Sequence, residues 1–159
     1  MRILLIEDDA TDADLMRQGL ARDLGAEVGW VETLRLAGRH LIEEAEGVDA
    51  VVMDLGLVDN AGAEGVAALV EMTDAPIVVW TGESRREERM ACIAAGASWV
   101  CRKPCSVSDV AEAVEVAIVA ATRERGRGRD DAETSLVRRL EEALEPVRVA
   151  VGGMRVAAV

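Results

Sequence analysis

Short apolar segments recur along the first two thirds of the chain and alternate with longer stretches of mixed polarity. Five of the segments have the length of strands and are rich in β-branched residues: Ile3 to Ile6, Val28 to Val31, Ala50 to Met53, Ile77 to Trp80 and Trp99 to Cys101. Four of them are almost continuously apolar, which is typical of strands buried on both faces. The pattern therefore predicts a parallel sheet that helices cover on both sides.

The stretches between the apolar segments have the periodicity of helices, because their apolar residues recur every three or four positions. A fifth helix is predicted from about Val107 to Thr122, with Ser106 or Ser108 as its cap. Strands and helices thus alternate in a (βα)5 pattern, and right-handed crossovers give such a chain an α/β fold with a doubly wound sheet. Its ligands are expected outside the carboxyl ends of the strands.

The charge of the chain divides it into two parts. Residues 1–123 contain 11 Lys and Arg against 23 Asp and Glu, a net charge of −12, whereas residues 124–159 contain seven of each. In residues 124–131, Arg alternates with Gly before two Asp, which is typical of a linker. We therefore predict a main domain at 1–123, a linker at 124–131 and a separate segment at 132–159.

The segment at 132–159 contains a helical pattern followed by an alternating one. Leucines recur every fourth residue from Leu136 to Leu144 and predict a short helix that ends at Pro146. Residues 147–151 then alternate, Gly152-Gly153 can form a two-residue turn, and the rest is mostly apolar, so a β-hairpin is favoured. Two isolated strands are barely stable in water, so we expect the hairpin to pack on its own domain, on a second copy in a homodimer or on a partner. We expect the segment to mediate interaction of this kind.

Composition excludes several classes of protein. The net charge of −12 argues against a nucleic-acid partner, since phosphate backbones are bound by clustered Lys and Arg. The apolar runs fall short of the about 20 residues of a membrane span, and the N-terminus lacks the pattern of a secretory signal. We therefore expect a cytoplasmic protein with no membrane span. The cysteines Cys92, Cys101 and Cys105 lack the spacing of a zinc site and are expected to be reduced thiols.

Polar side chains follow four of the predicted strands. They are Glu7, Asp8 and Asp9 after the first strand, Asp54 after the third, Thr81 after the fourth and Lys103 after the fifth. The carboxyl ends of parallel strands meet at one edge of the sheet, so these side chains should converge there. Crowded carboxylates repel one another, and a hard cation bound through oxygen relieves the repulsion. The sequence therefore predicts a Mg²⁺ site at this edge.

Lys103 is the single lysine among the 18 basic residues, and the other 17 are arginine. Its compact ammonium suits contact with one phosphoryl oxygen, whereas a planar guanidinium favours a two-point contact. A carboxylate beside Mg²⁺ can attack a phosphoryl group when metal and ammonium neutralise the transferred oxygens. The hydroxyl of Thr81 can donate to another of these oxygens, and the loop at Gly82 can let it move inward. This combination indicates phosphoryl transfer.

Four motifs, in this order, resemble the receiver domain of response regulators in bacterial two-component signalling. They are Ile3-Leu4-Leu5-Ile6-Glu7-Asp8-Asp9, Asp54-Leu55-Gly56-Leu57, Trp80-Thr81-Gly82, and Ala95-Gly96-Ala97-Ser98 leading to Lys103-Pro104. The resemblance covers residues 1 to about 123. It implies a flavodoxin-like sheet with the strand order 2-1-3-4-5.

The resemblance also implies roles for the acidic residues. Asp54 is the phosphoacceptor and a metal ligand, Asp8 binds Mg²⁺ directly, and Glu7 helps through water. The backbone carbonyl of Gly56 is a further ligand. Asp9 is a weaker candidate, because its position suits the orientation of the following helix.

On the phosphoryl side of the site, the resemblance implies that Thr81 and Lys103 hold the transferred group and that Gly82 belongs to the switch loop. Val100 is a departure, because the family usually has Tyr or Phe at that position as a rotameric reporter. Trp99 is adjacent, but it faces the opposite side of the strand. The usual aromatic switch is therefore absent.

In functional terms the resemblance implies a single-domain response regulator that acts as a phosphoprotein and not as an ordinary enzyme, although it catalyses its own phosphorylation and dephosphorylation. The phosphoryl group would come from a histidine kinase or a phosphotransfer protein, since the only histidine, His40, lies among charged residues of a predicted helix. The signal would pass to a downstream protein target by protein–protein interaction.

Two alternatives remain open. In the first, the chain keeps the receiver fold as a docking module that works without phosphorylation. In the second, the chain is a haloacid-dehalogenase-like phosphohydrolase, which also uses an aspartate nucleophile with Mg²⁺. That enzyme needs a second aspartate two residues after the nucleophile as general acid and base, and Gly56 stands there.

Overall fold

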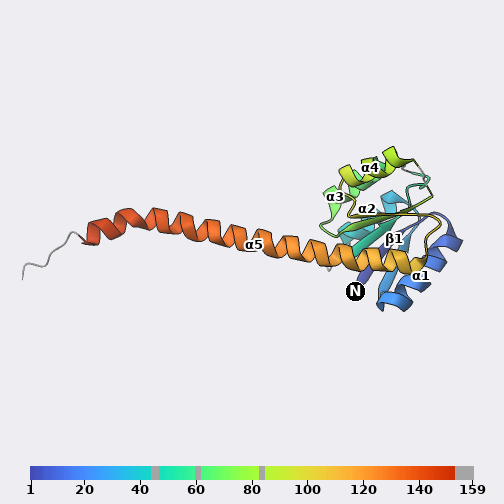
Figure 1. Ribbon diagram of the computed structural model, residues 1–159, viewed down its shortest axis with the longest axis horizontal. Coiled ribbons are helices and arrows are strands. Elements are labelled where there is room, and N and C mark those ends of the chain that lie inside the picture. Colours follow the sequence, from blue (N-terminus) through green and yellow to red (C-terminus); the bar gives the residue numbers. More distant parts are fainter. Residues whose placement is uncertain (44–46, 60–61, 83–84, 153–159) are drawn as a thin grey trace, which may run out of the picture. The chain divides into compact units, whose positions relative to one another are not determined.

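A computed structural model of the chain describes residues 1–43, 47–59, 62–82 and 85–152. Its centre is a five-stranded parallel sheet in the order β2-β1-β3-β4-β5 (Figure 1). The strands are β1 (Arg2–Ile6), β2 (Glu27–Val31), β3 (Ala50–Met53), β4 (Ile77–Thr81) and β5 (Trp99–Arg102). The predicted fold class and strand order are confirmed.

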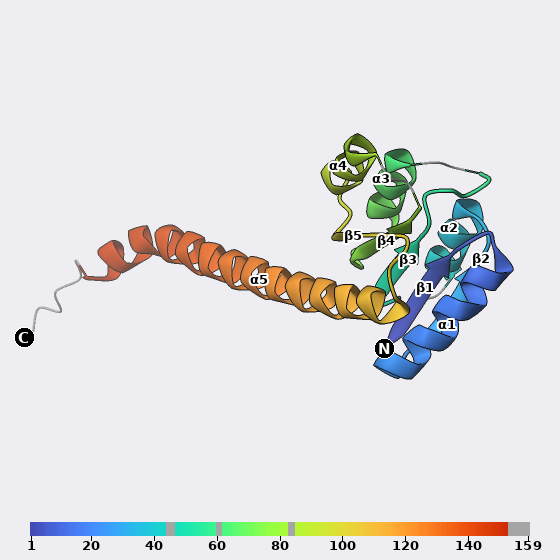
Figure 2. The same ribbon diagram turned by 45° about the vertical axis from the view of Figure 1, so that its right-hand side comes forward.

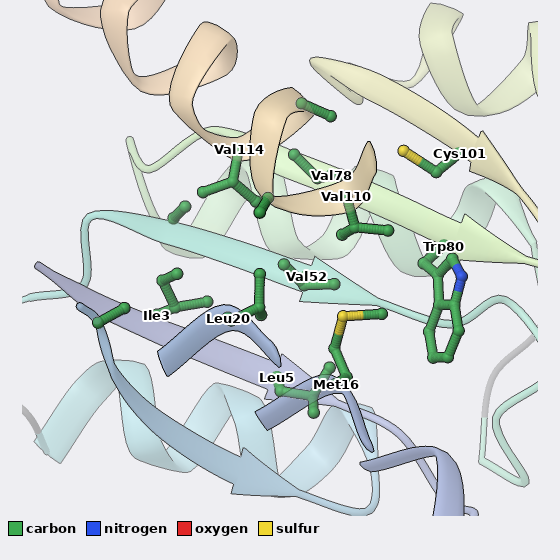
Figure 3. Close-up of a cluster of buried hydrophobic side chains, with 14 of the residues drawn as sticks. Ile3, Leu5, Met16, Leu20, Val52, Val78, Trp80, Cys101, Val110 and Val114 are labelled. Atoms are coloured by element: carbon green, nitrogen blue, oxygen red, sulfur yellow. The ribbon is translucent and has the colours of Figure 1, made fainter. Parts of the chain in front are cut away.

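Helices cover both faces of the sheet (Figures 1 and 2). They are α1 (Ala10–Leu24), α2 (Leu34–Glu43), α3 (Ala63–Met72), α4 (Arg86–Ala94) and α5 (Val107–Gly152). One buried cluster joins the sheet to α1 and the first turns of α5, and Met16 and Val114 belong to it (Figure 3). The other joins the sheet to α2, α3 and α4, and contains Leu69 and Cys92. The domain therefore has three layers.

Strand β1 shows why continuously apolar strands belong in the middle of such a sheet. Ile3 and Leu5 belong to the cluster under α1 and α5, whereas Leu4 and Ile6 belong to the cluster under α2, α3 and α4. Successive side chains of a strand point to opposite faces, and here both faces are covered. All four side chains are at most 1% exposed, so β1 contributes to both halves of the core.

The register of the strands brings the ends of β1 and β3 together. Ile6 is paired with Met53, and the backbone N–H of Asp54 donates to the carbonyl of Ile6 over 3.0 Å. Glu7 and Asp54 therefore emerge side by side. At the other side of β4, the N–H of Lys103 donates to the carbonyl of Thr81 over 2.8 Å. These pairings gather the polar residues at one edge.

Helix α5 is much longer than the sequence predicts. It begins as expected, where Ser106 Oγ accepts a hydrogen bond from the N–H of Asp109, but it continues without a break to Gly152. The predicted linker at 124–131 and the first hairpin strand at 147–151 are therefore wrong, because both are helical. The predicted second strand, at 154–159, lies outside the described residues.

The physical reason is that a helix is costly to nucleate and cheap to extend. The packed turns of α5 provide the nucleus, and each added residue then contributes a hydrogen bond. Gly126 and Gly128 oppose extension by only about 1 kcal/mol each. Pro146, predicted to end a helix, lies within α5. The chain divides into two compact units, Met1–Ala121 and Thr122–Val159, and the boundary falls inside this helix.

Within the described part of the chain, no helix combines the length and the apolar character that crossing a membrane requires.

Candidate functional site

The carboxylate of Asp54 is held in a fixed orientation just beyond β3. Its Oδ1 atom accepts hydrogen bonds from the backbone N–H of Leu55 at 2.7 Å and of Gly56 at 3.3 Å. Its Oδ2 atom accepts a hydrogen bond from Nζ of Lys103 at 3.2 Å. The side chain is 14% exposed, so Asp54 is accessible at the surface while both of its oxygens have defined partners.

Glu7 is the buried acid of the site, with only 1% of its surface exposed. Its Oε1 atom accepts from the N–H of Asp9 at 3.1 Å, and its backbone carbonyl accepts from Nε1 of Trp30 at 2.8 Å. Its Oε2 atom is buried without a hydrogen-bond partner and lies 3.6 Å from Nζ of Lys103. Burial raises the pKa of Glu7 above its usual value, although the Asp9 N–H and the Lys103 charge oppose this.

The ammonium of Lys103 lies between the acids. Nζ is 2.9 Å from Oδ2 of Asp12, 3.2 Å from Oδ2 of Asp54 and 3.6 Å from Oε2 of Glu7. Burial alone would lower the pKa of Lys103, but the hydrogen bond to Asp12 and the charges of Asp54 and Glu7 raise it above its usual value. Lys103 is therefore a cation that offsets part of the negative charge at this edge of the sheet.

The predicted phosphoryl-binding residues end the neighbouring strands. Thr81 is the last residue of β4 and is 2% exposed, and Gly82 follows it at the surface. Val100 lies on β5 and packs against the cluster under α3 and α4, whereas Trp99 is 48% exposed. The side chains of β5 thus alternate as predicted, and Val100 occupies the inward position where the family usually has an aromatic residue.

The remaining acids after β1 have different surroundings. Asp8 is exposed at the end of the strand. Asp9 caps helix α1, since its Oδ1 atom accepts from the N–H of Thr11 at 2.8 Å and of Asp12 at 2.9 Å. These hydrogen bonds, first that of Asp12 and then that of Thr11, lower the pKa of Asp9. Its helix-orienting role therefore has a structural basis.

The oxygen donors at this edge suit a hard divalent cation. The carboxylates of Glu7 and Asp54 both face the Lys103 ammonium, and Oε2 of Glu7 is an orphaned buried oxygen that a cation would satisfy. No three acidic, histidine or cysteine side chains of the described residues converge closely enough to form a metal site as they stand. The donor chemistry fits Mg²⁺, with the ammonium supplying positive charge in the arrangement observed.

Sequence reasoning missed two residues of the site. Asp12, in the first turn of α1, makes the shortest contact to Lys103, and the ring of Trp80 lies beneath the ammonium, with its centroid 3.8 Å from Nζ. The sequence contains a signal for Asp12, because this acid lies in the first turn of the helix that follows the first strand. That turn begins at the same edge of the sheet. Nothing local connects Trp80 with Lys103, since they lie on different strands.

Comparison with known proteins finds a matching family model and relatives of similar sequence. The family model described as response regulator receiver domain matches residues 3–115. The chain is 30% identical over 117 residues to the KDP operon transcriptional regulatory protein KdpE of Escherichia coli (strain K12), covering 73% of this chain and 50% of that protein. It is 33% identical over 119 residues to the transcriptional regulatory protein PdtaR of Mycobacterium tuberculosis, covering 74% of this chain and 56% of that protein. The chain thus spans about half the length of these relatives.

A similar solved structure is a response regulator protein from Burkholderia pseudomallei with a phosphorylated aspartic acid, calcium ion and citrate. It is 25% identical, has a TM-score of 0.65, and the match covers 78% of this chain and 72% of that one. Receiver domains of two-component systems are phosphoacceptors rather than ordinary enzymes, generally bind Mg²⁺ for phosphorylation, and interact with histidine kinases and downstream effectors. The family match and these identities show that the chain belongs to the response regulator receiver domain family.

Proposed function

We propose that Asp54 accepts a phosphoryl group from a histidine kinase or a phosphotransfer protein in a Mg²⁺-dependent reaction. The observation that carries the proposal is the Lys103 ammonium, 3.2 Å from Oδ2 of Asp54 and 3.6 Å from the buried Glu7. A nucleophilic carboxylate next to a fixed ammonium and to oxygen donors for a metal is the arrangement that phosphoryl transfer to aspartate needs.

The residues that would hold Mg²⁺ are Asp8, Asp54 and the backbone carbonyl of Gly56, with Glu7 acting through water. When bound, the metal neutralises charge on the phosphoryl oxygens. The related protein from Burkholderia pseudomallei was solved with a phosphorylated aspartic acid, which supports a phosphoacceptor role for an aspartate in this fold.

The residues of the chain orient and neutralise the reacting groups. An Asp54 oxygen forms the new bond to phosphorus while the bond between phosphorus and the donor atom breaks. The N–H groups of Leu55 and Gly56 restrain the carboxylate through Oδ1. Lys103 and the hydroxyl of Thr81 would bind the oxygens of the transferred group, so that its charge is compensated without rearrangement of the sheet.

We further propose that the chain signals by protein–protein interaction, and that residues 132–159 contribute to it as part of a homodimer. The helical backbone as far as Gly152 changes the expected form of this contact from a hairpin to a helix.

The haloacid-dehalogenase-like alternative needs an aspartate as general acid and base two residues after the nucleophile, and Gly56 cannot fill that role. In the docking alternative, a partner would bind equally well whether or not Asp54 is phosphorylated.

The test is to incubate the full chain with acetyl phosphate and Mg²⁺ and to measure its intact mass. The wild type should gain one phosphoryl group, and Asp54→Asn should gain none. Asp49→Asn is the matched control, because Asp49 precedes β3 at the opposite edge and should leave the modification unchanged. Failure of the wild type to be modified by acetyl phosphate and by a histidine kinase, or an unchanged gain in Asp54→Asn, would contradict the proposal.

A further inference from the structure

The shortest contact of the Lys103 ammonium is not with an acid at a strand end. It is with Asp12, whose Oδ2 atom lies 2.9 Å from Nζ, compared with 3.2 Å for Asp54 and 3.6 Å for Glu7. Asp12 comes from helix α1, 91 positions before Lys103 in the chain. The contact therefore ties the first helix to the residue that follows the last strand.

The position of Asp12 is well defined. The backbone N–H of Asp12 donates to Oδ1 of Asp9 at 2.9 Å, so the cap of α1 fixes the first helical turn. The side chain is 41% exposed, compared with 14% for Asp54. Asp12 thus reaches the ammonium from the solvent side, while Asp54 and Glu7 reach it from the sheet.

Trp80 bounds the ammonium on another side. The ring centroid lies 3.8 Å from Nζ, a distance at which a cation and an aromatic face attract each other. The ring is 5% exposed and belongs to the core cluster beneath α1 and α5 (Figure 3). Packing in the core therefore fixes the position of the ring next to the ammonium. A lysine ammonium has three N–H donors, and Asp12 and Asp54 each accept one hydrogen bond from it.

We propose that Asp12 is a positioning residue for phosphoryl transfer, whose carboxylate, together with the Trp80 ring, holds the Lys103 ammonium beside Asp54. This inference rests on the proposed function of Asp54. When Asp54 is phosphorylated, Lys103 keeps its hydrogen bond to Asp12 and exchanges its hydrogen bond to Oδ2 of Asp54 for one to a phosphoryl oxygen. The ammonium is thereby in place before the donor arrives, which lowers the cost of ordering a long side chain.

A competing physical effect has the opposite sign. The negative charge of Asp12 would repel an anionic phosphodonor, and if repulsion dominated, removal of the carboxylate would accelerate phosphorylation. Asp12→Asn and Asp12→Ala separate the two effects. Both remove the charge, but only Asn keeps a hydrogen-bond acceptor for the ammonium.

Lys103 can be observed directly because it is the only lysine of the chain. Lysine labelled with ¹³C and ¹⁵N gives one set of side-chain NMR signals in the full chain. The face of the Trp80 ring should shift the Cε protons of Lys103 upfield. In Asp12→Ala these signals should move toward those of free lysine, and in Asp12→Asn they should move less.

The kinetic part of the experiment measures the initial rate of phosphorylation by acetyl phosphate at saturating Mg²⁺. Asp12→Ala should lower the rate by about tenfold, the effect of one charge-assisted hydrogen bond, and Asp12→Asn by less. The control is Asp14→Ala, because Asp14 is also an acid of α1 but contacts Arg17 at 3.5 Å and not Lys103. It should change neither the rate nor the lysine signals.

An Asp12→Ala protein with wild-type rate and lysine signals, or with a faster rate, would overturn the positioning role. Both results presuppose a wild type that is phosphorylated on Asp54, so they leave the proposed function standing. A wild type that accepts no phosphoryl group overturns the proposed function and the positioning role together, and the two failures are thus distinguishable.

Discussion

The Nζ atom of Lys103 lies 3.2 Å from Oδ2 of Asp54, although 49 positions separate the two residues. The contact arises because β4 lies between β3 and β5, and all three strands end at the same edge. The backbone hydrogen bond from Lys103 to Thr81 then sets where the lysine leaves β5. The order of the strands, and not proximity in the chain, therefore creates the acceptor site.

Replacement of Lys103 should mainly affect phosphoryl transfer. Lys103→Ala removes the cation next to Asp54 and should lower the rate of phosphorylation by acetyl phosphate by about 100-fold. Lys103→Arg keeps the charge but not the compact head group, so it should recover only part of the rate. Stopped reactions analysed by intact mass give these rates, and wild-type kinetics in Lys103→Ala would contradict the role of the ammonium.

Asp59 should make stability depend on acid pH. Its two carboxylate oxygens accept hydrogen bonds from the N–H groups of Leu34 and Arg35, both at 3.0 Å, and so cap α2 from the loop after β3. Burial alone would raise the pKa of Asp59, but these N–H groups of Arg35 and Leu34 hold it below the usual 3.8.

For an acid with a lowered pKa in the folded state, the stabilisation is present above the unfolded value and is lost as pH falls through the folded value. Asp59→Ala should therefore lower the free energy of unfolding by about 1 kcal/mol at neutral pH. The difference from the wild type should shrink in acid, as the pH falls below the usual 3.8. Urea unfolding at both pH values measures it, with Asp74→Ala, in another exposed loop, as the control. A difference that persists in acid would argue against the cap.

Gly19 should not tolerate a side chain. A Cβ atom there would collide with Cγ1 of Val107, where α5 begins. Gly19→Ala should lower the free energy of unfolding by about 1–3 kcal/mol, even though Ala is normally the better helix former. Gly38→Ala is the matched control, since a Cβ atom there meets only the flexible Met72 side chain, with Sδ at 3.2 Å. Equal urea midpoints for the two variants would refute this packing argument.

The C-terminal part of α5 should determine the oligomeric state. Leu136, Leu140, Ala143 and Val147 follow one another at spacings of four, three and four on a helical backbone, which is the sequence pattern of a coiled-coil seam. The full chain should therefore sediment as a dimer, and a chain that ends at Arg123 as a monomer. Identical monomers, with and without Mg²⁺ and beryllofluoride, would remove the homodimer from the proposal.

Much of the acceptor site is predictable from short-range patterns. Apolar runs of strand length locate the sheet, and the residues directly after them, such as Asp54, Thr81 and Lys103, are assigned to one edge once the strands are taken as parallel. This works because burial on both faces leaves a continuous apolar signature in each central strand. The first residues of α5 are recognisable for a similar reason, since Ser106 and Asp109 form a local cap.

The errors arose where the outcome depends on more than local propensity. An Arg-Gly run is typical of a linker, yet at the end of a packed helix the same residues simply extend it. The alternating residues 147–151 have the pattern of a strand, but they continue α5 as far as Gly152.

The amino-acid sequence by itself determined the alternation of strands and helices and the set of polar residues at the strand ends, because both follow from local sequence patterns. Only the tertiary structure decided which side chains meet at that edge of the sheet. It brought Asp12 from α1 and the ring of Trp80 from β4 around one ammonium. Side chains of distant segments come into contact only when packing fixes the angle and register of the elements that carry them, and no local pattern contains that information.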